Sequence, residues 1–93
     1  MDAKTESMTA EPASLARLGS LNHVVGAKQI RKAFNRGAVS RVFLAKNADP
    51  AITEPIVALC QHHCVAFTWV KSMTDLGHAC GIEVGAAAAA IVA

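Results

Sequence analysis

Four basic side chains fall on one face of a predicted helix that begins just after Gly26. Within residues 27–37, the apolar positions 27, 30, 33, 34 and 37 share one side of the helical wheel. A glycine ahead of a helix lets a ligand approach the free N–H groups at the positive end of the helix dipole. This arrangement favours phosphate binding, and a solvent-exposed amphipathic helix fits the same pattern. The opposite side of the wheel has four cations and no acid, and its members are Lys28, Gln29, Arg31, Lys32, Asn35 and Arg36.

A second group of residues has side chains that could bind a metal ion, namely Cys60, His63 and Cys64. Structural zinc takes four ligands, and its thiolate pairs normally lie on a tight Cys-x-x-Cys turn. Here the two cysteines are a full helical turn apart, and a fourth ligand would have to come from elsewhere. Since free cysteine is among the most buried residue types, we expect packed thiols, with no metal and no cofactor. Cys80 is a lone cysteine outside any motif of a nucleophilic enzyme, which argues against nucleophilic catalysis.

Motifs typical of enzymes are missing from the sequence. It has no paired carboxylates, no nucleophile elbow and no Walker-type phosphate loop. We therefore expect no catalytic residues and no enzymatic activity. Trp69 lies beside Val70 and near Phe67 in a predicted strand, where core packing is favoured over stacking on a base.

A glycine-spaced segment near the C-terminus is the other informative stretch. Gly77, Gly81 and Gly85 precede the last predicted strand, and Ile82 and Val84 flank Glu83 between them. An apolar loop tip beside a basic helix can hold an unstacked RNA base. A tight turn with inward Ile and Val side chains fits the same residues, so both interpretations stay open here.

Alternating short strands and helices must position these groups. The residue after Ser72 begins a short helix that Gly77 or Gly81 ends, and Thr53 is the predicted N-cap of the helix before it, with Pro55 in the first turn. Asp49-Pro50 reads as a turn. The expected order is a helix at 13–18, a strand at 22–25, the basic helix, a strand at 39–45, a helix from 53 to about 63, a strand at 65–70, the helix after 72 and a strand at 85–93.

The last of these predictions goes against intrinsic propensity, because alanine is the best helix former. Residues 85–93 begin with a glycine, have Ile91 and Val92 near their end, and have no polar face. That pattern is typical of a strand buried on both sides, over which helices can pack closely. Strands that alternate with helices predict a three-layer α/β/α domain.

Composition limits the range of partners. A chain of 93 residues is one small domain, expected at 12–93 after a disordered tail at 1–11. The net charge is only +2, so a nucleic acid must meet a local basic patch. Three cysteines without a secretory signal predict reduced thiols and a cytoplasmic protein. Its longest apolar run falls well short of the ~20 residues that a membrane span requires, so no membrane partner is expected.

Three ordered blocks of the sequence resemble the kink-turn RNA-binding ribosomal proteins. These are the "seven-Ae" large-subunit family of archaea and its bacterial ribosomal-protein-like relatives of the YbxF type. The resemblance covers residues 15–92 and implies a three-layer α/β/α sandwich around a four-stranded mixed sheet. The blocks are GAKQIRKAFNRG at 26–37, VFLAKNADP at 42–50 and LGHACGIEVGAAAAAI at 76–91.

The resemblance implies binding of a kinked RNA helix–bulge–helix with tandem sheared G·A pairs, in ribosomal or other structured RNA. The family's basic helix enters the widened major groove, and its apolar loop covers an extruded nucleotide. The alternatives are a protein-interaction module on the same fold and a small metal-binding protein. We expect a free monomer. The expected RNA-binding residues are Gly26, Lys28, Gln29 and Lys32, with Arg36 on the RNA backbone, Lys46 near the same surface, and Ile82, Glu83 and Val84 in the apolar loop.

The sequence departs from the archaeal pattern at Lys28 and Gln29, where that pattern has Asn and Glu. The bacterial relatives carry Lys and Gln as this chain does. An ionised Glu only accepts hydrogen bonds, whereas Gln both donates and accepts. The departure therefore bears on how guanine is recognised, not on whether RNA is bound.

Overall fold

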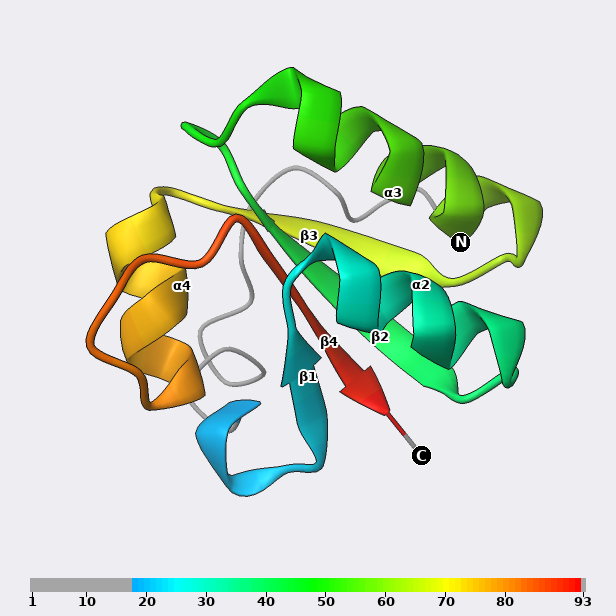
Figure 1. The fold of residues 1–93 in the computed structure, drawn as a ribbon, viewed down its shortest axis with the longest axis horizontal. Coiled ribbons are helices and arrows are strands. Elements are labelled where there is room, and N and C mark those ends of the chain that lie inside the picture. The colour runs from blue at the N-terminus through cyan, green and yellow to red at the C-terminus, as the bar shows by residue number, and fades with distance from the viewer. Residues whose placement is uncertain (1–17, 93) are drawn as a thin grey trace.

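The computed structural model describes residues 18–92 of the chain. The tail expected at 1–11 and almost all of the helix expected at 13–18 lie outside the described residues. Figure 1 shows the arrangement of the remainder. The elements are η2 (Leu18–Ser20, a 3-10 helix), β1 (His23–Val25), α2 (Ala27–Asn35), β2 (Val39–Ala45), α3 (Pro50–His62), β3 (Ala66–Val70), α4 (Met73–Cys80) and β4 (Ala88–Val92).

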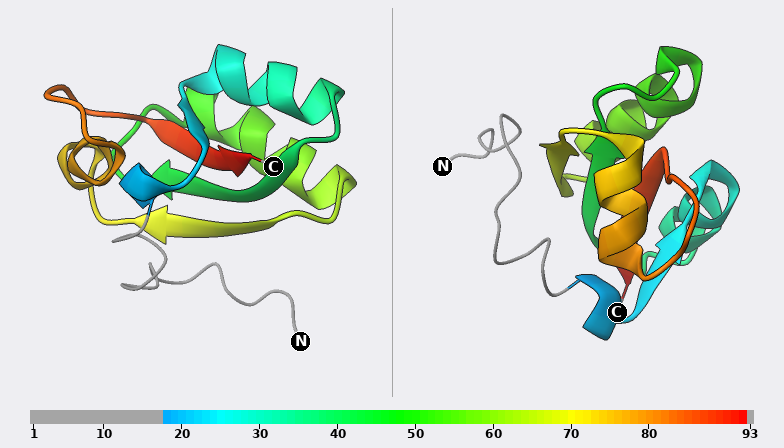
Figure 2. Two further views of the ribbon diagram at one scale, coloured as in Figure 1. Left: turned by 90° about the horizontal axis from the view of Figure 1, so that it is seen from below. Right: turned by 90° about the vertical axis from the view of Figure 1, so that its left-hand side faces the viewer.

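The strands form one mixed sheet in the order β1-β4-β2-β3. β2 and β3 are parallel, with Phe43 opposite Thr68, and β4 is antiparallel to both β1 and β2. The last strand of the chain therefore lies between the first two. The C-terminal ends of β2 and β3 and the start of β4 meet at one end of the sheet, where α2, α3 and α4 also begin (Figures 1 and 2).

Helices cover both faces of this sheet, which confirms the predicted three-layer α/β/α sandwich. Val42 and Leu44 point to the side of α2 and α3, where they join Ile30 and Ile56 in one buried cluster. The intervening Phe43 points to the other side, into a second cluster below α4 and η2 that includes Leu18, Leu76 and Cys80. This period-2 alternation along β2 is what a strand buried on both faces requires.

The alanine-rich segment is a strand, as predicted against its helix propensity, although it begins at Ala88 and not at 85. Ala88, Ala89 and Ala90 are fully buried. Ala88 and Ala90 face α2 and α3, whereas Ala89 faces α4. Tertiary packing decides the outcome here, because a helix would leave β1 and β2 without the strand that joins them.

The N-cap of α3 is Asp49, so the prediction of Thr53 as the N-cap was wrong. Asp49 is the N-cap, with its side chain accepting a hydrogen bond of 2.9 Å from the Ala51 N–H, and Pro50 occupies the first turn. Thr53 is buried within the helix, and Pro55 lies in its interior. The predicted turn Asp49-Pro50 is therefore the signal for a helix start, since Asp caps well and proline is preorganised for the first helical position.

The end of α4 settles the role of Gly77. Gly81, with φ of 81°, is the left-handed C-cap, and Gly77 lies inside the helix. A Cβ on Gly77 would stand 2.1 Å from the carbonyl oxygen of Val84. Gly77 is thus required for a close approach of the loop backbone to the helix, and it does not end the helix.

We expect Gly77→Ala to destabilise the fold by about 3 kcal/mol or more, because backbone atoms of both the helix and the loop would have to move apart. Helix propensity alone favours alanine over glycine by about 1 kcal/mol, so the two effects have opposite signs. Urea unfolding measures the difference. Thr74→Ala, at an exposed position of the same helix, is the matched control and should change stability by no more than about 0.5 kcal/mol. A stabilising Gly77→Ala would contradict the close approach.

Candidate nucleic-acid interface

The start of α2 leaves backbone donors without side-chain acceptors. Gly26 has φ of 98° and ψ of 150°, and no side chain caps the helix. Its N–H donates to the Ala88 carbonyl at 3.0 Å, and its own carbonyl accepts from Ile30 at 3.0 Å. The first N–H groups of a helix have no carbonyl one turn back to bond with, so those of α2 point outward at the positive end of the dipole.

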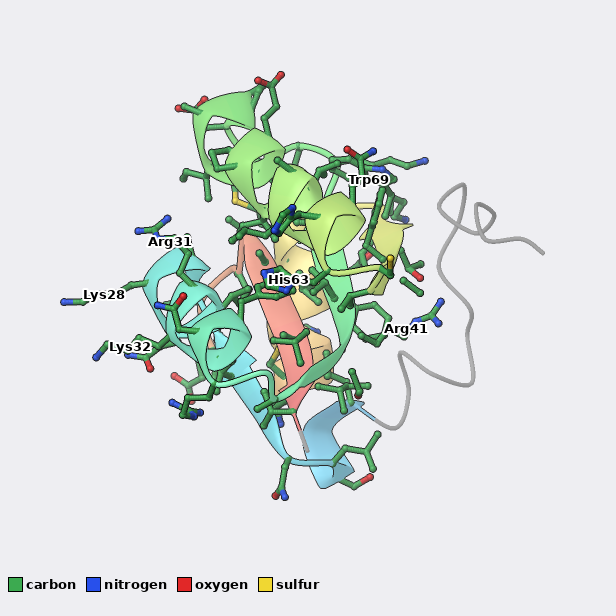
Figure 3. The ribbon with its side chains drawn as sticks, turned by 90° about the vertical axis from the view of Figure 1, so that its right-hand side faces the viewer. Lys28, Arg31, Lys32, Arg41, His63 and Trp69 are labelled. Carbon is green, nitrogen blue, oxygen red and sulfur yellow. The ribbon has the colours of Figure 1, made fainter. Side chains whose placement is uncertain are left out.

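The polar side of α2 is exposed along its length. We refer to Lys28, Gln29, Arg31, Lys32, Asn35 and Arg36 together as the basic face, and all six are exposed. Figure 3 shows Lys28, Arg31 and Lys32 extending from α2 on the same side, away from the rest of the molecule. Arg36 caps the far end of the helix, about 12 Å along its axis from Lys28. Arg31, which was outside the predicted set of contact residues, belongs to this surface by its position.

The loop at 82–87 is held beside α4 and leads to the start of α2. The Ala86 N–H donates to the Met73 carbonyl at 3.0 Å, and the Ala45 N–H donates to the Ala87 carbonyl at 2.9 Å. Figure 2 shows this segment running back along α4 before it enters β4. Since the Ala88 carbonyl accepts from Gly26, the loop ends directly next to the N-terminus of α2.

The three predicted loop residues differ in exposure. Val84 is 70% exposed, which is unusual for a large apolar side chain. Glu83 is also exposed, whereas Ile82 is half-buried and packs against the cluster below α4. The apolar tip of the loop is therefore Val84, and Ile82 also supports the core.

Asn47 contributes to this end of the sheet in a way that sequence reasoning missed. Its side-chain oxygen accepts a hydrogen bond of 2.9 Å from the Met73 N–H at the start of α4. The bond ties the loop after β2 to the helix on which the 82–87 loop packs. An Asn in a short polar loop is a frequent capping residue, but its partner is distant in sequence and no local pattern identifies it.

Lys46 is separated from the basic face. Its N–H donates to the Val70 carbonyl at 2.8 Å, which fixes its backbone where β2 and β3 end. Its side chain lines a hollow with Trp69 and Val57, on the side of α3 away from α2. Figure 3 shows Trp69 on the opposite side of the molecule from Lys28 and Lys32. The structure thus brings together the start of α2 and the apolar loop, but not Lys46.

Two of the three cysteines, Cys60 and Cys80, are buried. Burial raises the pKa of the Cys60 thiol to about 12, and burial also raises the pKa of Cys80. The expectation of a packed thiol is wrong for Cys64, which is exposed in a left-handed conformation with φ of 58° just beyond α3. Within residues 18–92, no group of three or more His, Cys, Asp or Glu side chains is arranged to hold a metal ion.

The chain belongs to a known family. Residues 14–93 match the family described as ribosomal protein L7Ae/L30e/S12e/Gadd45. Because this match covers most of the chain, it confirms the family resemblance noted from the sequence. The expectation that the protein is not an enzyme agrees with the family description, which is one of ribosomal proteins, and with relatives that are named RNA-binding proteins.

Relatives and solved structures agree with this membership. Over 69 residues, 74% of this chain and 84% of the relative, the sequence is 49% identical to an RNA-binding protein of Bacillus pumilus. The sequence is also 44% identical to the RNA-binding protein YbxF of Geobacillus stearothermophilus, again over 69 residues that make up 74% of this chain and 84% of the relative. A solved structure of the Giardia lamblia 15.5kD RNA binding protein superposes with a TM-score of 0.79 at 26% identity, covering 100% of this chain and 84% of that one.

No helix among residues 18–92 is long and apolar enough to cross a membrane.

The different burial of the thiols predicts their reactivity. We expect Cys64 to react rapidly with a thiol reagent such as Ellman's reagent in the folded protein, and Cys60 and Cys80 to react only on unfolding. The thiolate is the nucleophile, and burial keeps the two inner thiols protonated and inaccessible. Absorbance titration at pH 8 in the presence and absence of denaturant gives the stoichiometry. More than one fast thiol in the folded state would contradict the burial of Cys60 and Cys80.

Proposed function

We propose that this protein binds kink-turn RNA through the basic face of α2 and the tip of the 82–87 loop. The observation that carries the proposal is their juxtaposition, joined by the hydrogen bond from Gly26 to Ala88. Membership of the family and the names of the RNA-binding relatives support RNA as the partner.

The two parts of the surface suit different features of such an RNA. A row of cations without a neighbouring acid attracts closely spaced phosphates, as in the widened groove beside sheared G·A pairs. The uncapped N–H groups after Gly26 add donors for phosphate or for base edges. Val84, exposed on a fixed backbone, offers an apolar contact to a base that the kink has extruded from the stack.

Lys28 and Gln29 occupy the first turn of α2, where the base-reading contacts of this proposal are made. The amide N–H groups of a Gln side chain can donate to guanine O6 or N7 on the major-groove edge, and Lys can donate to the same acceptors. The natural target is then a structured RNA containing such a kink, with ribosomal RNA as one candidate. We propose that the free protein is a cytoplasmic monomer.

A salt series tests the electrostatic part of the proposal. The basic face suggests about three to five phosphate neighbours, so the logarithm of the association constant should fall against the logarithm of salt with a slope of roughly −3 to −4. Filter binding on a kink-turn RNA measures the slope, and an unkinked duplex of the same composition is the control. Equal affinity for the kink-turn and the duplex would contradict specific binding of the kink-turn. No binding to either RNA would favour a protein-interaction module.

Two substitutions separate phosphate attraction from the apolar contact. Lys32→Ala should lower both the affinity and the salt slope, the latter by about one unit. Val84→Ala should weaken binding by roughly 1 kcal/mol with an unchanged slope, because it removes apolar contact with a base and no charge. Both positions are exposed, so the variants should fold normally. Filter binding across a salt series measures both effects.

Asn35→Ala is the matched control for Lys32→Ala, since it lies on the same exposed side of α2 and removes no charge. Its salt slope should equal that of the unmodified protein. Ile82→Ala is a poorer test of the loop, because Ile82 also packs against the core and its loss should weaken binding and stability together. If Val84→Ala changed the slope as much as Lys32→Ala, the division of roles between helix and loop would be wrong.

A further inference from the structure

An open hollow lies between α3 and the edge strand β3, on the side of α3 away from the basic face. Its volume is about 350 Å³, at the small end of the range of about 300–1,000 Å³ that is typical of ligand pockets. The space suits one small planar ligand and not a folded segment. It is lined by Lys46, Ala48, Pro50, Thr53, Glu54, Val57 and Trp69.

Trp69 is only partly buried in the core, and its indole ring also lines the hollow. The indole packs against the cluster of α2 and α3, as the expectation of core packing required, yet the residue stays half-buried and lines the hollow. Figure 3 shows it beside α3, with Lys28 and Lys32 on the far side of that helix. An open indole face in a strand is a platform on which any base can stack.

Two opposite charges face the same hollow without meeting. Lys46 follows β2, and Glu54 lies on the first turns of α3; both are exposed. Neither forms an ion pair within 4.0 Å with another residue of the described part of the chain, where the recorded ion pair is Lys71–Asp75. The hollow is therefore lined by a cation, a hydrogen-bond acceptor and an indole ring.

We propose that this hollow is a second nucleotide site, in which a base stacks on Trp69. Lys46 binds the phosphate of the same nucleotide, and the Glu54 carboxylate accepts hydrogen bonds from the amino or ring N–H groups of the base. The apolar side chains of Val57 and Ala48 line the hollow beside the base. A base with a phosphate matches all three groups, whereas an aliphatic ligand would leave both charges unused.

The site is separate from the surface proposed for the kink-turn and makes no use of Gly26, Lys32 or Val84. The nucleotide has two sources with the same chemistry: a free mononucleotide, or an unpaired nucleotide in a single-stranded extension of a bound RNA. An extension would reach the hollow by passing the N-terminal end of α3, where Pro50 and Lys46 lie.

Tryptophan fluorescence tests the proposal directly, because Trp69 is the one tryptophan of a chain without tyrosine. AMP, GMP, CMP and UMP are titrated separately, followed by a kink-turn RNA with and without a single-stranded tail. We expect saturable quenching by the mononucleotides, or by the tailed RNA alone if the site takes only a linked nucleotide. Binding of the untailed RNA, followed by gel shift, reports on the proposed kink-turn surface independently.

Two lysines make a matched pair for this experiment. Each follows the last residue of a parallel strand and is exposed, but Lys46 lines the hollow and Lys71 does not. Lys46→Ala should weaken the quenching titration about fivefold and Lys71→Ala should leave it unchanged. Glu54→Gln should alter the relative affinities of the four mononucleotides, because an amide also donates.

Absence of quenching with both the mononucleotides and the tailed RNA would overturn the second site. An equal response of Lys46→Ala and Lys71→Ala would also overturn it, since the effect would then come from overall charge. Either result leaves the kink-turn proposal standing if the gel shift with untailed RNA persists.

Discussion

The hydrogen bond from the Gly26 N–H to the Ala88 carbonyl joins the parts of the molecule on which the proposed function depends. It connects the residue before α2 with the first residue of β4, more than sixty positions later in the chain. Gly26 accepts from Ile30 at the same time, so the peptide groups that start the helix are fixed relative to the sheet. The direction of α2, and with it the placement of the basic face beside the 82–87 loop, follows from this junction.

The junction depends in turn on a strand made almost entirely of alanine. Ala88, Ala89 and Ala90 are buried between two helical layers, and their small side chains leave room for large ones from the neighbouring strand and from the helices. The close contact of Val84 with Gly77 serves the same end on the other face. Small residues in β4 and α4 thus let a small domain hold both a helix and a loop at one end of the sheet without a large core.

Local sequence patterns were sufficient to predict those helices and strands for which periodicity, composition and capping residues all indicate the same structure. The period of α2, the apolar run of β2 and the N-cap at Ser72 each indicate one structure, and each is found, whereas the end of α4 was left open between Gly77 and Gly81 and lies at Gly81. Pro55 misled because proline usually marks the first turn, whereas here Asp49 and Pro50 had already started the helix. The exposure of Val84 and Cys64 and the bond from Asn47 to Met73 depend on packing between distant segments, so periodicity holds no information on them.

The position of α3 explains why one small domain can carry two surfaces with different chemistry. Its buried side, at Ile56 and Cys60, packs on the sheet, and the helix separates the basic face from the hollow at Trp69. Lys46 lines the hollow, although the family resemblance predicts it to lie near the RNA surface. Its position at the end of β2 places it near the N-terminus of α3, around which a single strand would pass from one surface to the other. An RNA that ends at the kink would then contact α2 and the 82–87 loop, and only a longer strand would also reach the hollow.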